Sequence, residues 1–272
     1  MILRRLLSLA LVAGLVVGCV NMSSTFTVRP DGSGTFTERV TMSPQLAKMM
    51  KGMKEAADSS GASGGLFSKA DIEARADTLK GLRLKSTNML SGPEGEGYEA
   101  VYEFDDLNDV RHDPKPGEVM PDKAKKRGGG GGASDLLSQV DMSFEPGSPA
   151  TLTITMPRDT SSEDSFSMNT PGEGPPSDQQ MRMMRKMMST SGFRLAVDVD
   201  GEIVETNATH REGSTITLIN MDFGELAKDS TAFREVFAGQ DEPESPQAAI
   251  DRLNSKPGLT IEPKETITIR FQ

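Results

Sequence analysis

The chain has 272 residues, of which 35% are hydrophobic and none is tryptophan, and its formal net charge is −10 at pH 7. A negative charge of this size argues against nucleic acid as a partner and against electrostatic attachment to an anionic lipid surface. The length allows one large domain or two small ones. The modest hydrophobic content indicates that part of the chain is linker rather than core.

The amino terminus has the features of a secretory signal segment. Two arginines at positions 4 and 5 precede an apolar run over residues 6–17, which is too short to span a bilayer as a helix. Residues 16–19, Val-Val-Gly-Cys, resemble the bacterial lipobox. This resemblance implies that the thiol of Cys19 carries diacylglycerol and that a peptidase removes residues 1–18. Two or three acyl chains on one residue give stable anchoring, since each buried methylene contributes about 0.8 kcal/mol.

Cys19 is the only cysteine in the chain, so it has no partner for an internal disulfide. The alternative is an ordinary secreted protein with a coincidental cysteine at the cleavage site. Removal of residues 1–18 takes away two positive charges and no negative ones, so the formal charge falls from −10 to −12. Val20, rather than aspartate, follows Cys19, which predicts sorting to the outer membrane if the source is Gram-negative.

Three polar segments are predicted to be linkers because they lack the apolar surface that offsets chain entropy. The first, 112–135, contains a basic run and then five consecutive glycines, and the others are 158–178 and 239–246. The mature chain is therefore divided into halves, 19–111 and 136–272, which form either one sheet or two. The basic run could bind phosphate or lipid headgroups, although a solvated loop beside a glycine hinge also explains it.

Seven segments alternate apolar and polar residues with a period of two: 26–28, 98–104, 140–144, 152–156, 193–199, 216–218 and 267–271. Strands with one buried and one wet face are typical of antiparallel sheets. Glycine-containing turns between consecutive strands agree with hairpins, at 31–34, 92–97, 145–147, 200–201 and 211–213.

Helical segments interrupt the strands. Ser43-Pro44 begins a predicted helix that runs through Ala57, and Ser68 caps a second with Ile72 and Ala76 on its apolar side. Further helices are predicted over 179–188, 223–237 and 246–254. The pattern predicts an α+β fold, an antiparallel β-sheet built from hairpins with helices packed on one face. A bound lipid could also cover that face.

Several residues invite a catalytic or metal-binding interpretation. Residues 61–65, Gly-Ala-Ser-Gly-Gly, match a nucleophile elbow with Asp198 and His210 downstream, but the buried strand that the elbow requires before its serine is missing. His112 and His210 have no partners at ligand spacing and are predicted to be exposed loop residues. We therefore expect neither a catalytic site nor an enzyme.

Acidic residues give two weak metal candidates. Asp198 and Asp200 resemble the start of a calcium loop, but its twelfth position is Thr209 rather than the required glutamate. The carboxylates of 105, 106 and 109 are explained by the start of a short helix. The sequence thus predicts no metal site and no cofactor.

Methionine is unusually frequent, with 17 in the chain. Five of them cluster within 181–188, interleaved with Arg182, Arg185 and Lys186: Met181, Met183, Met184, Met187 and Met188. Thioethers are soft ligands for Cu(I). Positive charges among the sulfurs oppose cation binding, and methionine also serves as adaptable packing in a core or under a lipid.

Two short blocks resemble a family of uncharacterised bacterial lipoproteins that includes the mycobacterial LppM-like group. Residues 26–36 form a strand, an Asp-Gly turn and a strand like the opening of that family, and 201–216, with Asn207, resembles its later strand pair. The chain lacks the family's tryptophan and carboxy-terminal transmembrane helix. The resemblance implies an envelope location and an exposed α+β domain, allows for lipid binding, and supplies no catalytic residues.

Two functions follow as expectations. In the first, the chain is a lipid-anchored envelope module that binds lipid or another apolar ligand between sheet and helices. In the second, it is a structural or assembly lipoprotein that contacts another envelope protein. Both place the protein on a membrane through Cys19.

Overall fold

The computed structural model describes residues 20–48, 52, 67–92, 95–110, 140–156, 176–237 and 245–272. Cys19, the signal segment 1–18 and the predicted linker 112–135 lie outside these residues. Residues 158–175 of the predicted linker 158–178 also lie outside them, whereas 176–178 are described and the helix α6 begins at Asp178.

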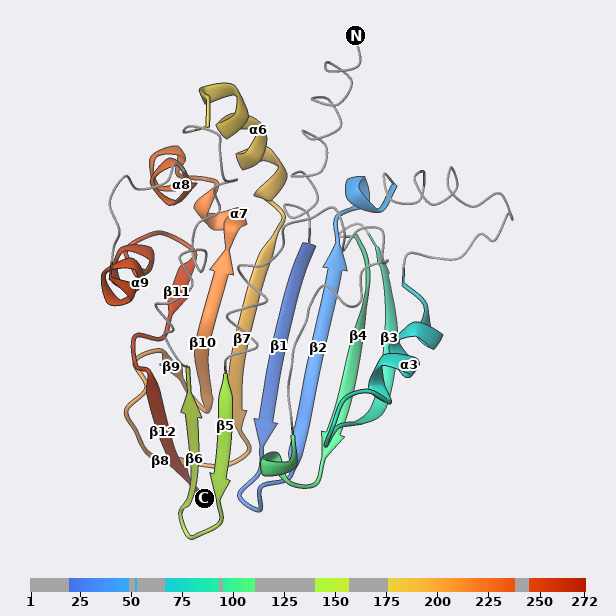
Figure 1. Ribbon diagram of the computed structural model, residues 1–272, viewed down its shortest axis with the longest axis vertical. Helices are drawn as coiled ribbons and strands as arrows, with labels where there is room; N and C mark the ends of the chain where they lie inside the picture. The colour runs from blue at the N-terminus through green and yellow to red at the C-terminus, as the bar shows by residue number, and fades with distance from the viewer. Residues whose placement is uncertain are drawn as a thin grey trace.

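The larger sheet has eight strands in the order β11-β10-β7-β1-β2-β4-β3, with β9 pairing to β10 (Figure 1). Its strands are β1 (Val20–Val28), β2 (Gly34–Met42), β3 (Arg83–Gly92), β4 (Gly95–Phe104), β7 (Gly192–Val199), β9 (Arg211–Glu212), β10 (Thr215–Asp222) and β11 (Leu259–Ile261). Strands from both sides of the predicted linker 112–135 join this one sheet.

A tight turn joins β1 to β2. The backbone N–H of Arg29 donates to the carbonyl oxygen of Ser33 at 2.8 Å, and Gly32 has a positive φ of +84°. A side chain at Gly32 would also collide with the ring of Phe144. Glycine is therefore required here both by the backbone conformation and by space. The Asp-Gly turn predicted from the sequence is confirmed.

The sheet is mixed rather than purely antiparallel. β1 runs parallel to β7, with Asn21 opposite Gly192 and Val28 opposite Val199, whereas β1 and β2 form an antiparallel hairpin. The predicted hairpin turn at Asp200-Gly201 is also wrong, because β7 and the next strand, β8 (Ile203–Thr206), belong to different sheets. Sequence alternation reports a wet face but not the direction of a neighbouring strand that is distant in the chain.

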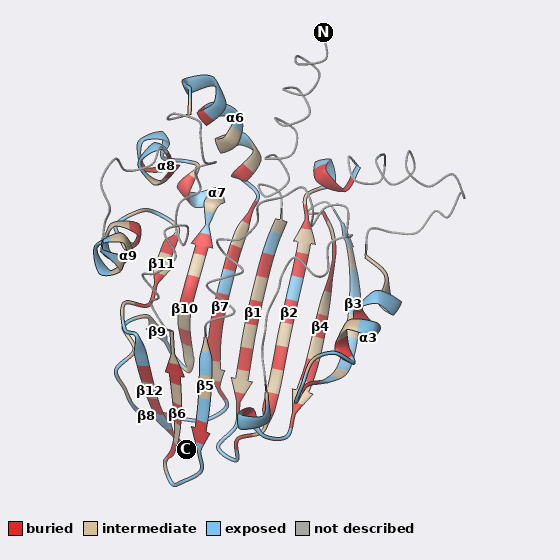
Figure 2. Cartoon of the chain, in the orientation of Figure 1, coloured by how far each residue is buried: buried red, intermediate tan, exposed pale blue. Residues whose placement is uncertain are grey.

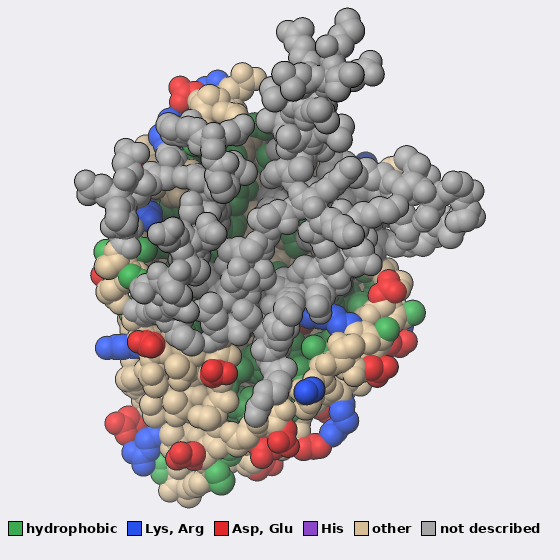
Figure 3. Space-filling view, viewed as in Figure 1, with side chains coloured by type: hydrophobic (Ala, Val, Ile, Leu, Met, Phe, Trp, Pro, Cys, Tyr) green, Lys and Arg blue, Asp and Glu red, His purple; other side chains and the backbone are tan. Residues whose placement is uncertain are grey.

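The smaller sheet has the order β5-β6-β12-β8, with β5 (Asp141–Glu145), β6 (Ala150–Thr155) and β12 (Thr266–Phe271). Figure 1 shows it in front of the lower part of the larger sheet. The rings of Phe144 and Phe271 meet edge to face at 6.4 Å, and the buried residues of both sheets form one core cluster. Charged side chains of both signs are scattered over the outward surface of the smaller sheet (Figure 3).

The helices lie around the larger sheet rather than across the whole of one face. Their bounds are α3 (Lys69–Ala76), α6 (Asp178–Met188), α7 (Phe223–Leu226), α8 (Ser230–Phe237) and α9 (Pro246–Asn254), with a 3₁₀ turn, η2, at Leu107–Asp109. α3 packs against β3 and α9 against β11, while α6 to α8 gather at the end of the sheet where β1 begins (Figures 1 and 2). The α+β class is confirmed, and a second sheet provides part of the cover that the sequence assigned to helices.

Candidate functional site

A row of polar side chains crosses the otherwise apolar inner face of the larger sheet. Ser24 on β1 pairs with Glu38 on β2, Glu38 pairs with Ala100 on β4, and Ala100 pairs with Thr87 on β3. Cross-strand partners share a face of the sheet, so these side chains form one line across four strands. Ser24 and Glu38 are both 0% exposed.

Apolar and aromatic rows lie on both sides of this line. The neighbouring inward residues of β1, β2 and β4 are Met22, Val40 and Tyr98 on one side, and Phe26, Phe36 and Tyr102 on the other. The rings of Phe36 and Tyr102 stack at 5.8 Å. A carboxylate therefore lies in the middle of an apolar surface, where an unpaired charge would be very costly.

Helix α3 supplies the opposite charge. Ser68 caps the helix by accepting from the backbone N–H of Asp71, and Ile72 and Ala76 turn its apolar side to the sheet. Arg75 lies on that same side. Its Nη1 and Nη2 donate to Glu38 Oε1 and Oε2 at 2.6 and 3.1 Å, a bidentate pair in which Arg75 is 10% exposed.

Tyr98 completes the hydrogen bonds of the carboxylate. Its hydroxyl donates to Glu38 Oε1, and Arg75 Nη1 lies 3.4 Å from the same hydroxyl. The ring of Phe67, just before α3, packs edge-on against Tyr98 at 5.5 Å. The pair is thus sealed by aromatic rings as well as by the helix.

Burial and charge shift the pKa values of these groups. Burial would lower the pKa of Arg75, but the charge and hydrogen bonds of Glu38 outweigh it and raise that pKa. Burial, with the charge of Glu38, raises the pKa of Tyr98 and raises that of Tyr102 to about 12. Arg75 is therefore charged, and both tyrosines are neutral, across the physiological range.

Four polar atoms of the cluster have no hydrogen-bond partner among the residues that the structure describes. They are Ser24 Oγ, Arg75 Nε, Thr87 Oγ1 and Tyr102 OH. Most buried polar groups in proteins are paired, and each unpaired one costs about 1–3 kcal/mol. Several such groups around one carboxylate, within an apolar surface, have the composition of a ligand site, where a few polar groups orient a mostly apolar ligand.

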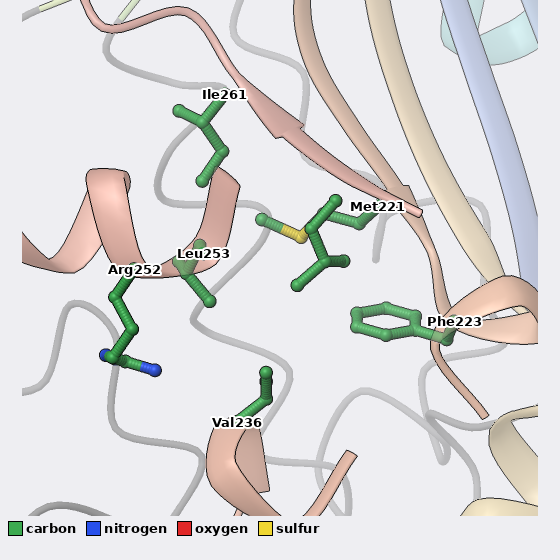
Figure 4. Close-up of a pocket in the computed structure, with 7 residues that line it drawn as sticks. Met221, Phe223, Val236, Arg252, Leu253 and Ile261 are labelled. Carbon is green, nitrogen blue, oxygen red and sulfur yellow. The ribbon is translucent and has the colours of Figure 1, made fainter. Parts of the chain in front are cut away.

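A small apolar pocket lies toward the opposite edge of the larger sheet, beside β10 and β11. Met221 of β10, Phe223 of α7, Val236 of α8 and Leu253 of α9 converge on it, and the side chain of Arg252 lies to one side (Figure 4). Its volume is about 40 Å³. Pockets for drug-sized ligands are roughly 300–1,000 Å³, so this one accommodates a chain end at most.

The residues that the sequence offered for chemistry do not come together. Asp106 caps the 3₁₀ turn η2, as predicted, and Asp105 pairs with Arg83 at the surface. Asp198 accepts from the hydroxyls of Ser214 and Thr215 at 2.6 and 3.1 Å. Residues 61–65 and His112 lie outside the described residues. Within those residues, no three His, Cys, Asp or Glu side chains converge to hold a metal ion.

His210 differs from the exposed loop histidine that was predicted. It is partly buried, its Nε2 has no hydrogen-bond partner in the described part of the chain, and its backbone N–H donates to Glu262 at 3.0 Å. Glu262 is 0% exposed and also accepts from the backbone N–H of Thr209 at 2.8 Å. The carboxylate orders the loop before β10, and this order buries the histidine.

The methionines of α6 are divided between two environments. Met181 and Met188 are buried, whereas Met183 is 50% exposed. The helix therefore uses part of the cluster for packing, which is the alternative to copper weighed above. In the described chain no helix is long and apolar enough to cross a membrane.

The polar row was missed by the sequence analysis, although the strand pattern contained a signal. Glu38 occupies an inward position in β2, in step with Phe36 and Val40. Arg75 likewise interrupts the apolar side of α3 beside Ile72 and Ala76. Opposite charges at two core-facing positions suggest that they form a pair, but nothing in the sequence showed that α3 brings Arg75 within reach of β2.

No protein-family model matches the chain, and no curated protein matches it. The solved NMR structure of the folded domain of LppM from Mycobacterium tuberculosis is similar over 93% of this chain and 91% of that chain, with a TM-score of 0.33 and 10% sequence identity. A TM-score of this size carries no argument about function. The function must therefore be inferred from this chain's own residues.

Proposed function

We propose that the chain is a lipid-anchored cell-envelope protein whose folded domain binds a lipid or another amphiphile against the inner face of the larger sheet. The observation that carries this proposal is the set of four polar atoms around Glu38 that have no partner among the described residues, on an otherwise apolar surface. The polar part of the ligand would pair with these atoms, and its apolar part would lie along the neighbouring rows. Its role is binding rather than catalysis.

The membrane attachment rests on the sequence around Cys19. The lipobox-like residues 16–19 are followed directly by β1, which begins at Val20. The proposed anchor would therefore hold the domain close to the membrane without a spacer. In a Gram-negative source the expected membrane is the outer one, because Val20 takes the place of aspartate.

A ligand would recover free energy that the cluster loses on burial. A hydroxyl or phosphate oxygen near Tyr102 would accept its O–H, and a hydroxyl near Ser24 would give and receive hydrogen bonds. The ion pair would remain in place and orient the ligand. A ligand with hydroxyls on an apolar body, such as a glycolipid or a phospholipid, fits this combination of groups.

The direct test is mass spectrometry of organic extracts from the purified mature protein. The proposal expects one class of amphiphile at a fixed stoichiometry, and an intact mass that includes acyl chains on Cys19. A protein that is empty and takes up no lipid from phospholipid or glycolipid micelles would overturn the binding proposal. An unmodified Cys19 would separately overturn the anchor.

Ser24→Ala tests the site itself, with Ser23→Ala as the matched control on the opposite face of the same strand. If Ser24 serves a ligand, alanine should stabilise the lipid-free protein by about 1 kcal/mol, because an unpaired hydroxyl is removed. The same change should weaken lipid binding several-fold. Both tyrosines of the chain lie in the cluster and there is no tryptophan, so tyrosine fluorescence reports on this site alone. Equal binding by both variants would contradict the site.

One observation favours the alternative of an envelope protein partner. β3 is an edge strand of ten residues, pairs only with β4 in the described sheet and leaves Met89 43% exposed. Long exposed edges can accept a strand from another chain. Co-purification of one stable envelope protein, lost in a Met89→Pro variant that still binds lipid, would support this alternative.

A further inference from the structure

Helix α6 lies at the same end of the larger sheet as the start of β1. The parallel pairing sets Asn21 of β1 opposite Gly192 of β7, and α6 ends at Met188, just before β7. Adjacent strands are about 4.8 Å apart, so the chain leaves α6 close to the residue that follows Cys19. The proposed lipid anchor and α6 are therefore neighbours.

α6 also extends away from the sheet at this end. Figure 1 shows it rising beyond the start of β1. Its 11 residues correspond to about 16 Å of helix. A bilayer surface held at Cys19 would meet this helix before it met the strands.

The surface of α6 is basic although the chain is acidic. Arg182, Arg185 and Lys186 oppose a single acid, Asp178, so the helix has a net charge of +2 against −10 for the chain. Asp178 pairs with Arg234 of α8 at 2.5 Å. No acidic side chain in the described part of the chain forms an ion pair with the three cations of α6.

The helix is also amphipathic in a way that leaves apolar surface outside. Met181 and Met188 are buried against the body, while Met183 is 50% exposed between exposed cations. Helices that lie in the headgroup region of a bilayer have Lys and Arg on a polar face and apolar side chains that enter the acyl boundary, and the cations are attracted to anionic lipid. The side chain of Met183 can enter the acyl boundary while the cations contact phosphates.

We propose that α6 docks on the anionic lipid surface to which the chain is anchored, with Met183 inserted and with Arg182 and Lys186 on headgroup phosphates. This inference rests on the proposed anchor at Cys19. It gives the domain a fixed orientation, with the end bearing β8 pointing away from the membrane. The acidic charge of the remaining surface favours the same orientation, because it is repelled by anionic lipid.

Met183→Cys tests the contact in the intact lipoprotein. If Cys19 is acylated, the new cysteine is the only free thiol and accepts an environment-sensitive fluorophore. Val204→Cys is a matched control, because Val204 is 53% exposed but lies on β8, at the opposite end of the molecule (Figure 1). The labelled proteins are reconstituted in vesicles of phosphatidylcholine with phosphatidylglycerol that contain brominated lipid.

We expect strong quenching of the label at position 183 and little at position 204. Quenching at position 183 should fall in vesicles without phosphatidylglycerol, at high salt, and in Arg182→Gln/Lys186→Gln, with roughly a fivefold loss of surface affinity for each cation removed. Equal quenching at the two positions would overturn the proposal.

The acylation of Cys19 is measured separately, from the mass that the acyl chains add to the protein. If Cys19 is unmodified, the anchor fails. The label is then attached to Cys19→Ser/Met183→Cys, in which position 183 holds the only thiol, and it should still be quenched when the chain is added to phosphatidylglycerol vesicles. The absence of that quenching would overturn the docking of α6 as well.

Discussion

Two regions of the larger sheet, one around β2 and β4 and the other around β10 and β11, are covered by different kinds of contact. We call the first the α3 side and the second the apolar side. Over β2 and β4, α3 brings Arg75 to the buried Glu38, and several polar atoms around this pair have no partner in the described chain. Over β10 and β11, α8 and α9 bring mainly apolar side chains, and the imperfection is a gap of about 40 Å³. Apolar packing needs no further explanation, whereas a buried polar cluster that is only partly satisfied costs stability. The difference points to function on the α3 side.

The largest effect should come from breaking the buried ion pair. Arg75→Met leaves Glu38 charged and unpaired, and we expect a loss of about 3–5 kcal/mol in the free energy of unfolding. Urea unfolding followed by circular dichroism measures this loss. In Glu38→Met/Arg75→Met most of the stability should return, because methionines fill the space without a charge. A single-variant loss below about 1 kcal/mol, the size expected for a surface pair, would show that the pair is solvated.

On the apolar side the corresponding change is Leu253→Ala. Leu253 is 6% exposed, and its truncation enlarges the pocket, so we expect a loss of about 2–5 kcal/mol in the free energy of unfolding. Val204→Ala, at an exposed position, is the control and should change stability little. An unchanged free energy of unfolding in Leu253→Ala would contradict this comparison, because the pocket would then not be part of a packed core.

Alkaline pH tests the α3 side without a mutation, because both tyrosines of the chain lie there. The pKa of Tyr102 is raised to about 12 and that of Tyr98 is also raised, by burial and by the charge of Glu38. A raised pKa contributes stability that is complete below the ordinary value of 10.0 and is lost as the pH rises through the folded value. Tyrosinate absorbance and loss of circular dichroism should therefore rise together above pH 10. Ionisation near pH 10 in a folded protein would mean that the tyrosines are exposed.

Much of the fold could be predicted because its strands alternate regularly. The end of β1, β4, β6 and β12 were found from their period of two, the Asp-Gly turn indicated the β1–β2 hairpin, and α9 lies over the predicted residues 246–254. The helix predicted over 223–237 is two helices, because the chain breaks at residues 227–229 between α7 and α8. Local patterns and caps carried these predictions.

Long-range relations could not be predicted in the same way. The parallel pairing of β1 with β7 joins residues more than 160 positions apart, and no local pattern encodes it. The contact of Arg75 with Glu38 depends on where α3 lies, so the cluster remained hidden even though each charge was visible at a core position. His210 was misjudged because the carboxylate that orders its loop, Glu262, comes from the far end of the chain.

The smallest effect concerns the pocket beside α8. Val236→Ile adds one methylene where space exists, and burial of a methylene is worth about 0.8 kcal/mol, so the free energy of unfolding should rise by that amount or less. Calorimetry of the lipid-free protein measures it, and a loss of about 1–3 kcal/mol would instead show overpacking.

The same variant decides where the apolar part of a ligand lies. If Val236→Ile expels co-purified lipid that Ser24→Ala retains, the ligand occupies the pocket and not the polar row. If Ser24→Ala releases the lipid and Val236→Ile keeps it, the pocket is a packing gap and the binding site lies under α3.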